Sequence, residues 1–157
     1  MHTNRPSGVR VIGGLSAVSF AAIATLHFVW LRNPWPLRNW SEWSHAFGGE
    51  NFRVRDDVMT AVALLFLAAG YIVAVLTALL PRIGPAWLYR RCAWGIAFIL
   101  TVRALLGFAE MLRTFLNPLT PPPFRETILL YLTIYLPLFL LLGLATAYVA
   151  LRARTPT

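Results

Sequence analysis

The sequence predicts an all-α protein, a four-helix transmembrane bundle with up-down-up-down topology. Of its 157 residues, 58% are hydrophobic and only 13% are charged, whereas soluble domains are nearer half apolar and a quarter charged. Four stretches also reach the length of about 20 mostly apolar residues that a helix needs to cross a bilayer. A chain of this length is expected to form a single membrane domain, residues 1–157.

The apolar stretches follow one another with proline- and glycine-rich connections and without the alternation of a strand. The predicted spans are residues 11–31, 58–80, 93–112 and 127–151, and the longest connection is the outer loop 32–57. The first span follows Arg5 and Arg10 in the manner of a signal peptide. Its apolar run continues to Trp30, and three more spans follow, so we expect an uncleaved helix. The second span has no charged residue, and the fourth is interrupted by Pro137.

Charge and composition exclude several classes of function. All 14 basic residues are arginines, and most of them stand singly or in pairs at the ends of apolar segments, where they anchor helices at the headgroups. A nucleic-acid partner is therefore not expected, despite the net charge of +8. The single cysteine, Cys92, excludes an intramolecular disulfide and a multi-cysteine metal site. We find no nucleotide-binding, metalloprotease or hydrolase motif, and no facing histidine pair for haem, so no metal or cofactor is predicted.

The distribution of arginines predicts the orientation. With the N-terminus inside, the inner segments contain seven arginines and the outer segments six. The inner segments are shorter, and the outer loop also carries acidic residues. Because the positive-inside rule counts basic residues in short loops, we predict a multi-pass protein of the cell membrane with both termini in the cytoplasm.

Polar side chains within the spans gather toward one side of the membrane. The loops 32–57 and 113–126 lie on the same side, because an even number of crossings separates them. At about 1.5 Å per helical residue, the depths from that side are roughly 3 Å for Glu110, 6 Å for His27, 7 Å for Tyr131 and 13 Å for Arg103 and Tyr135, with Asp57 at the mouth. The opposite half of the spans has almost no ionisable side chain. The sequence therefore predicts a one-sided polar pocket within the bundle.

Arg103 is the central residue of this prediction. A guanidinium facing lipid costs about 2.5 kcal/mol or more, so we expect it to face the interior of the bundle. Glu110 and Gly107 lie on the same helical stripe. The candidate partners of Arg103 are Glu110, Tyr135, Asp57 and the backbone carbonyl that Pro137 leaves without a donor. A structural clasp between the third and fourth helices is the alternative.

Histidine and tryptophan side chains give further candidates near the outer loop. His27 is either an interfacial hydrogen-bonding residue or a group that contacts a ligand or transfers a proton. Trp30, Trp35, Trp40 and Trp43 are typical of an interfacial belt, with a short amphipathic helix around residues 37–47 lying on the membrane. The same loop is alternatively a lid over the polar pocket.

Several short patterns carry a family resemblance. They are H-x-x-W at His27–Trp30, "PAWLYRRCAWGIAFILTVRALLGF" at residues 85–108, "FRET" at 124–127 and "YLPL" at 135–138. Together they closely resemble a widespread bacterial family of small four-helix integral membrane proteins that is catalogued as a domain of unknown function. The resemblance implies that the recurring positions are His27, Trp30, Pro85, Trp87, Trp94, Gly95, Arg103, Gly107, Tyr135 and Pro137.

Two departures from the family pattern stand near the loops. Where the family has a glycine-rich turn after the tryptophan, this chain has "LRNPWPLRN", and where the family has Asp-Thr before the fourth helix, this chain has Glu126-Thr127. The resemblance implies a fold and a set of recurring residues, and it supplies no activity.

Three functions remain open from the sequence. The first is a pocket that binds a small amphiphile, quinone or lipid headgroup, and its ligand-binding residues would be Arg103, Glu110, His27, Tyr135, Tyr131, Asp57 and Trp30. The second is a structural or accessory subunit of a larger membrane complex. The third is a membrane-embedded enzyme with Glu110 or His27 as acid or base, although no motif assigns a catalytic residue.

Overall fold

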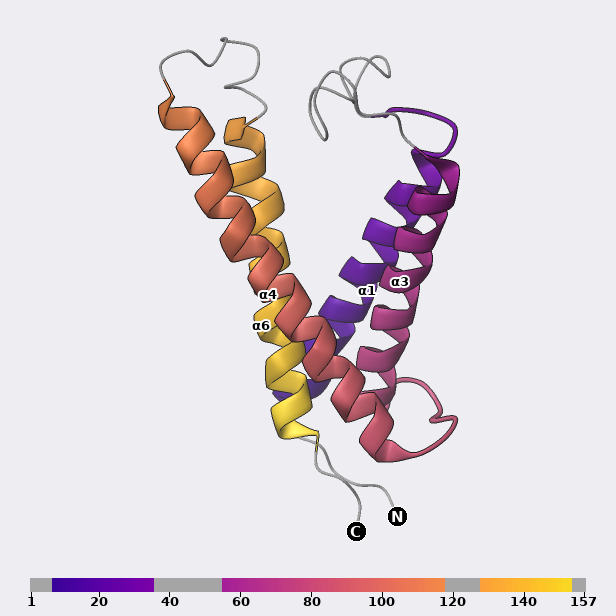
Figure 1. The fold of residues 1–157 in the computed structure, drawn as a ribbon. Coiled ribbons are helices and arrows are strands. Elements are labelled where there is room, and N and C mark those ends of the chain that lie inside the picture. The colour runs from indigo at the N-terminus through magenta and orange to yellow at the C-terminus, as the bar shows by residue number, and fades with distance from the viewer. Residues whose placement is uncertain (1–6, 36–54, 118–127, 154–157) are drawn as a thin grey trace.

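The computed structural model describes residues 7–35, 55–117 and 128–153, and they form long helices without any strand (Figure 1). In chain order the elements are α1 (Ser7–Val29), α3 (Asp56–Leu76), α4 (Ala86–Leu116), the π-helical turn η1 (Tyr131–Tyr135) and α6 (Leu136–Arg152). The turn η1 continues directly into α6, so the two form one rod. The predicted all-α fold is confirmed.

The four rods are long and apolar enough to cross a membrane. Successive rods alternate in direction, so both termini and the α3–α4 connection lie at one end, here called the terminal end (Figure 1). The loop end is the other one, where α1 and α4 finish and α3 and η1 begin. The chain is therefore a multi-pass membrane protein with up-down-up-down topology, as predicted. At 31 residues α4 is about 46 Å long, so it extends beyond a hydrocarbon core of about 30 Å.

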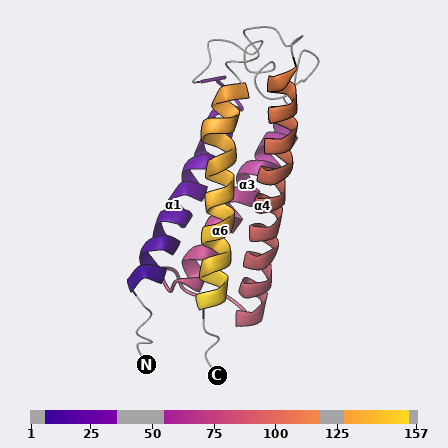
Figure 2. The same cartoon turned by 90° about the vertical axis from the view of Figure 1, so that its left-hand side faces the viewer.

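The rods pack as two pairs, α1 with α3 and α4 with α6. The pairs meet at the terminal end and diverge toward the loop end in the shape of a V (Figure 1). The helix α6 connects the pairs, because it also contacts α1, and Figure 2 shows it between α1 and α4. The core follows this shape, since its main cluster lies mostly in the terminal half and consists of Phe20, Ala69, Val73, Val75, Leu76, Tyr89, Ala93, Leu100, Leu142, Val149, Ala150 and Ala153.

Small residues bring the helices of each pair close together. A Cβ at Gly70 of α3 would be 3.2 Å from the backbone oxygen of Ala17 in α1. A Cβ at Gly143 of α6 would be 3.2 Å from the backbone oxygen of Ala97 in α4. In a bilayer, where burial of apolar surface does not drive association, close backbone packing at small residues is a main source of helix–helix attraction. Each pair is therefore a tight unit.

The helix α3 ends in a Schellman motif. The N–H of Leu79 donates to the carbonyl of Ala74 over 2.9 Å, and the N–H of Ala78 donates to that of Val75 over 3.0 Å. This pattern places the residue after the cap in the left-handed region, and Ala78 has φ of 59°. The apolar sequence continues to Leu80, so hydropathy alone does not mark this end.

The turn η1 ends at Tyr135, two residues before Pro137. Proline has no N–H, and its ring conflicts with the carbonyl four residues earlier, which is that of Thr133. The chain widens here instead of continuing as an α-helix, and the N–H of Leu136 donates to the carbonyl of Tyr131. The hydroxyl of Thr133 donates to the carbonyl of Leu129 over 2.6 Å, which also supports the turn. Such π turns occur frequently at functional sites.

Candidate functional site

An apolar groove lies between α3 and α4, near the middle of the spans. Its volume is about 230 Å³, and it is lined by Phe20, Val62, Leu65, Phe66, Ala69, Ile96, Ile99 and Leu100. Leu65 is 69% exposed and Ile99 is 65% exposed, so the groove is open along its length rather than sealed. Here α3 and α4 belong to different pairs, and the groove occupies the region where the V begins to open.

Arg103 continues the α4 side of this groove toward the loop end. It follows Ile96 by seven positions and Ile99 by four, a spacing that keeps all three side chains on one helical face. The Arg103 side chain is exposed, and its Nη1 lies 2.7 Å from the position that a Cβ of Gly107 would occupy. Leu136 closes the other side of this glycine, with its Cδ2 2.8 Å from the same position. The guanidinium therefore extends outward along α4, next to the beginning of α6.

Of the two tyrosines of η1, Tyr131 lies near Arg103 and Tyr135 lies next to Tyr131. The rings of Tyr131 and Tyr135 are 5.2 Å apart between centroids, because residues four positions apart lie on one side of a helical rod. The charge of Arg103 is close enough to Tyr131 to act on its phenol. Arg103, Tyr131 and Tyr135, here called the arginine–tyrosine cluster, come from two neighbouring rods and lie one turn beyond the groove.

Glu110 is on the same flank of α4 as Arg103 but does not pair with it. Its side chain is exposed, nearly two turns further toward the loop end. Among the residues that the structure describes, the one salt bridge joins Arg55 and Asp57. The helical stripe of Arg103, Gly107 and Glu110 was predicted to face the interior of the bundle. In the structure Gly107 is buried, whereas Arg103 and Glu110 are exposed.

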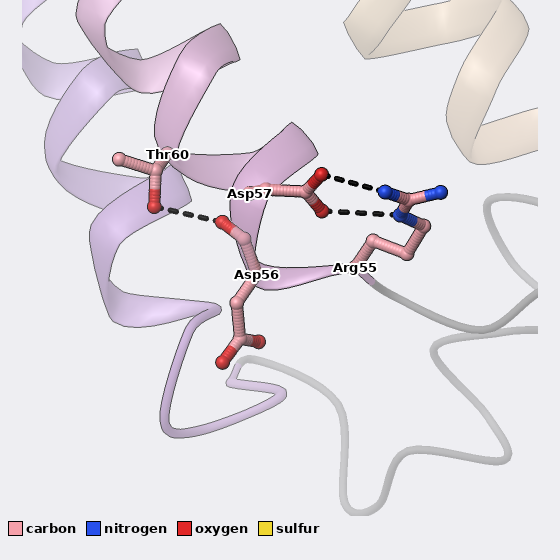
Figure 3. A network of polar contacts seen from close by, with 4 residues as sticks. All are labelled: Arg55, Asp56, Asp57 and Thr60. Atoms are coloured by element: carbon pink, nitrogen blue, oxygen red, sulfur yellow. Dashed lines mark hydrogen bonds and ion pairs between the residues drawn. The ribbon is translucent and has the colours of Figure 1, made fainter.

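Asp57 forms a salt bridge with Arg55 at the start of α3. Nε and Nη2 of Arg55 donate to its two carboxylate oxygens over 3.1 and 2.7 Å (Figure 3). The hydroxyl of Thr60 donates to the backbone oxygen of the neighbouring Asp56 over 2.7 Å. Asp57 and Arg55 are 65% and 73% exposed, and both lie on the α1–α3 pair. The charge of Asp57 is therefore matched locally, on the opposite side of the V from Arg103.

His27 lies behind the groove, on α1. Its Nδ1 is 2.8 Å from the carbonyl oxygen of Ile23. A carbonyl only accepts, so Nδ1 carries the hydrogen, and Nε2 of the neutral ring has the lone pair. The imidazole centroid is 5.4 Å from the ring of Phe66, which lines the groove, and 5.0 Å from that of Trp30. His27 therefore supports the groove wall and does not line the groove.

Trp30 anchors the chain where α1 ends. It is buried to 4% exposure, and its indole N–H donates to the carbonyl of Trp35 over 2.6 Å. Met59 of α3 packs in the same small cluster, together with Leu26 and Leu31. The other tryptophans of the outer loop, the amphipathic segment 37–47 and Glu126 lie outside the described residues.

The seven predicted site residues thus form two groups. The α1–α3 pair holds His27, Trp30 and Asp57, and the α4–α6 pair holds Arg103, Glu110, Tyr131 and Tyr135. No group of three His, Cys, Asp or Glu side chains that could hold a metal ion is found within residues 7–35, 55–117 and 128–153. Sequence reasoning missed the groove itself, because its residues are apolar and look like any lipid-facing or core residue. The one available signal was the spacing of Ile96, Ile99 and Arg103.

Comparison with known proteins gives a family without an activity. No curated protein and no solved structure matches the chain. A family model described as a protein of unknown function, DUF3995, matches residues 20–146, which include the groove, His27 and the arginine–tyrosine cluster. This agrees with the family resemblance found in the sequence. Because the match covers most of the chain, from within α1 to within α6, this membrane protein belongs to the DUF3995 family.

Proposed function

We propose that this protein is a membrane-embedded binding protein for a small amphiphile, a quinone or a lipid. The apolar part of the ligand lies in the groove between α3 and α4, and its polar head lies at the arginine–tyrosine cluster. One observation carries the proposal: the face of α4 that lines the groove continues, at helical spacing, into Arg103. An amphiphile likewise has an apolar part that continues into a polar head.

The charge of Arg103 supports a ligand with an anionic or carbonyl head. The residue is about 13 Å inside the apolar run of α4, where a cation without a partner is costly. It forms no salt bridge with any residue in the described part of the chain. A ligand head that accepts hydrogen bonds would supply a partner for the guanidinium, and the low dielectric of the bilayer would strengthen the attraction.

The groove supports a ligand with an apolar part. Small-molecule sites are concave and mainly apolar, with a few polar groups that fix the orientation of the ligand. Every residue that lines the groove is apolar, and the cluster beyond it supplies one guanidinium and two phenols. Leu65 and Ile99 are largely exposed, and a ligand would cover them.

Binding is tested by native mass spectrometry of the protein purified in a mild detergent. We expect a bound lipid or quinone on the wild type, and its loss from Arg103→Gln. Arg113→Gln is the matched control, because it removes an exposed arginine from the last turns of the same helix. Ile99→Trp fills the groove and should also remove the ligand, whereas Phe98→Trp, 69% exposed and outside the groove, should retain it. Identical ligand occupancy in all five proteins would overturn the proposal.

The proposed orientation places the terminal end in the cytoplasm. All six acidic residues of the chain lie in the loop-end connections or in the helix turns nearest to them: Glu42, Glu50, Asp56, Asp57, Glu110 and Glu126. The terminal end has arginines without any acidic residue, and two of them lie over aromatic rings, Arg91 over Trp87 and Arg152 over Tyr148. This asymmetry supports an inner terminal end, because basic residues in short segments are retained in the cytoplasm. The groove then opens toward the outer face of the cell membrane.

A further inference from the structure

We infer that the ligand is a single-chain fatty acid, with its carboxylate at Arg103 and its acyl chain in the groove between α3 and α4. The inference rests on the proposed function, and it names the class of amphiphile. Three properties of the site carry it: the charge of the cluster, the size of the groove and the small number of polar groups that the described residues place beyond the groove.

The charge of the cluster selects an anion. Arg103 is a permanent cation, and Glu110, the carboxylate nearest to it along the helix, does not pair with it. The other candidate carboxylate, that of Asp57, is bound by Arg55 through two hydrogen bonds. A guanidinium and a carboxylate match in shape, because two parallel N–H groups donate to the two carboxylate oxygens. A neutral quinone carbonyl would leave the positive charge without a counter-charge.

The size of the groove selects one narrow chain. Sites for drug-sized ligands have volumes of about 300–1,000 Å³, and this groove has about 230 Å³. That volume is too small for two acyl chains side by side. From Ile96 to Arg103 the groove face is about 10 Å long at 1.5 Å per residue. Because Leu65 and Ile99 leave the groove open, a longer chain can continue into the bilayer.

The polar groups near the cluster select a small head. The cluster offers one guanidinium and two phenols, and the adjacent side chain of Leu136 is apolar. A carboxylate has two oxygens, and the guanidinium alone can donate a hydrogen bond to each of them. A lysophospholipid would bring a phosphate, a glycerol and a further substituent to the same depth, and each polar group without a partner would be costly there. A fatty acid therefore fits the site better than a lipid with a large headgroup.

The inference is tested by binding of amphiphiles of equal chain length to the delipidated wild-type protein in detergent. The probes are hexadecanoate, hexadecanol and a lysophosphatidylglycerol with the same acyl chain, with a short-tailed quinone as a fourth probe. Native mass spectrometry measures the affinity of each. We expect hexadecanoate to bind at least roughly tenfold more tightly than hexadecanol, a difference of about 1.4 kcal/mol that reflects the carboxylate alone. Arg103→Gln should remove the difference between acid and alcohol, and Arg103→Lys should restore part of it.

The outcomes separate the inference from the proposed function. If the quinone or the lysophospholipid binds more tightly than hexadecanoate, or if hexadecanol binds as tightly as hexadecanoate, the fatty-acid inference is overturned. The proposed function as an amphiphile-binding protein then still stands. If none of the four probes binds, both fail. The comparison among probes uses the wild type, so it holds even if the Arg103 variants do not fold.

Discussion

Nη1 of Arg103 lies so close to Gly107, one turn further along α4, that a Cβ at position 107 would be 2.7 Å from this nitrogen. The next two nearest atoms belong to Leu136, at 2.8 and 3.7 Å. Both obstructing groups are the ends of flexible side chains, so the backbone of α4 need not move to admit a methyl group. Position 107 therefore controls where the guanidinium lies, without changing its charge.

Gly107→Ala should displace Arg103 and weaken binding while the protein stays folded. We expect the affinity for hexadecanoate to fall by roughly three- to tenfold, a loss of up to about 1.4 kcal/mol, measured by native mass spectrometry. Gly95→Ala is the matched control, because it lies on the same helix and a Cβ there would meet nothing within 4 Å. The control should leave binding unchanged. Equal affinities of the two variants would show that the position of Arg103 does not matter.

Thr146→Val should stabilise the protein. Thr146 is completely buried, and its Oγ1 has no hydrogen-bond partner among the described residues. A buried hydroxyl without a partner costs about 1–3 kcal/mol, so its replacement by a methyl group of similar size should raise the free energy of unfolding by about 1 kcal/mol. The measurement is the midpoint of thermal unfolding in detergent.

The comparison for this change is Thr77→Val. Thr77 is equally buried, but its Oγ1 donates to the carbonyl of Val73 over 2.9 Å. Removing that bond should lower the unfolding temperature slightly, since hydrogen bonds within membrane proteins contribute about 0.6 kcal/mol on average. A decrease for Thr146→Val as large as for Thr77→Val would contradict the prediction.

Ala78→Gly should stabilise the end of α3. Ala78 has φ of 59°, and a side chain in the left-handed region costs about 1–2 kcal/mol, which glycine avoids. We expect the unfolding temperature to rise, in keeping with a gain of about 1 kcal/mol. Ala68→Gly, at an exposed position inside the same helix, should lower it, because interior glycine costs about 0.5–1 kcal/mol. Effects of the same sign at both positions would refute the Schellman assignment.

Cysteine labelling of intact cells should establish the orientation. In a background in which Cys92 is replaced by alanine, Asn33→Cys stands at the loop end and Ile83→Cys stands in the α3–α4 connection at the terminal end. Both positions are exposed. If the terminal end is cytoplasmic, a membrane-impermeant maleimide should label position 33 in intact cells and position 83 only after the cells are opened. The reverse pattern would place both termini outside.

The sequence by itself determined the number of spans, their alternating direction and the end at which the polar residues gather. These properties are local, because a spanning segment must be long, apolar and internally hydrogen-bonded regardless of its neighbours. Because an even number of crossings separates the two polar loops, the sequence also predicted that Arg103, Tyr131 and His27 lie nearer to the same side of the membrane. Pro137 predicted an interruption of the last helix, but the sequence did not predict that this interruption would be a π turn.

Only the tertiary structure decided which helices pair, where the pairs diverge and which polar residues meet. In the tertiary structure, Asp57 forms a salt bridge with Arg55, the ring of His27 contacts that of Phe66, and Tyr131 lies near Arg103. The tertiary structure also created the groove between α3 and α4 from residues such as Ile99, which have no distinguishing mark. The physical reason is that lipid tails are as apolar as a helix surface, so hydropathy does not distinguish a side chain that faces lipid from one that faces a helix or a groove.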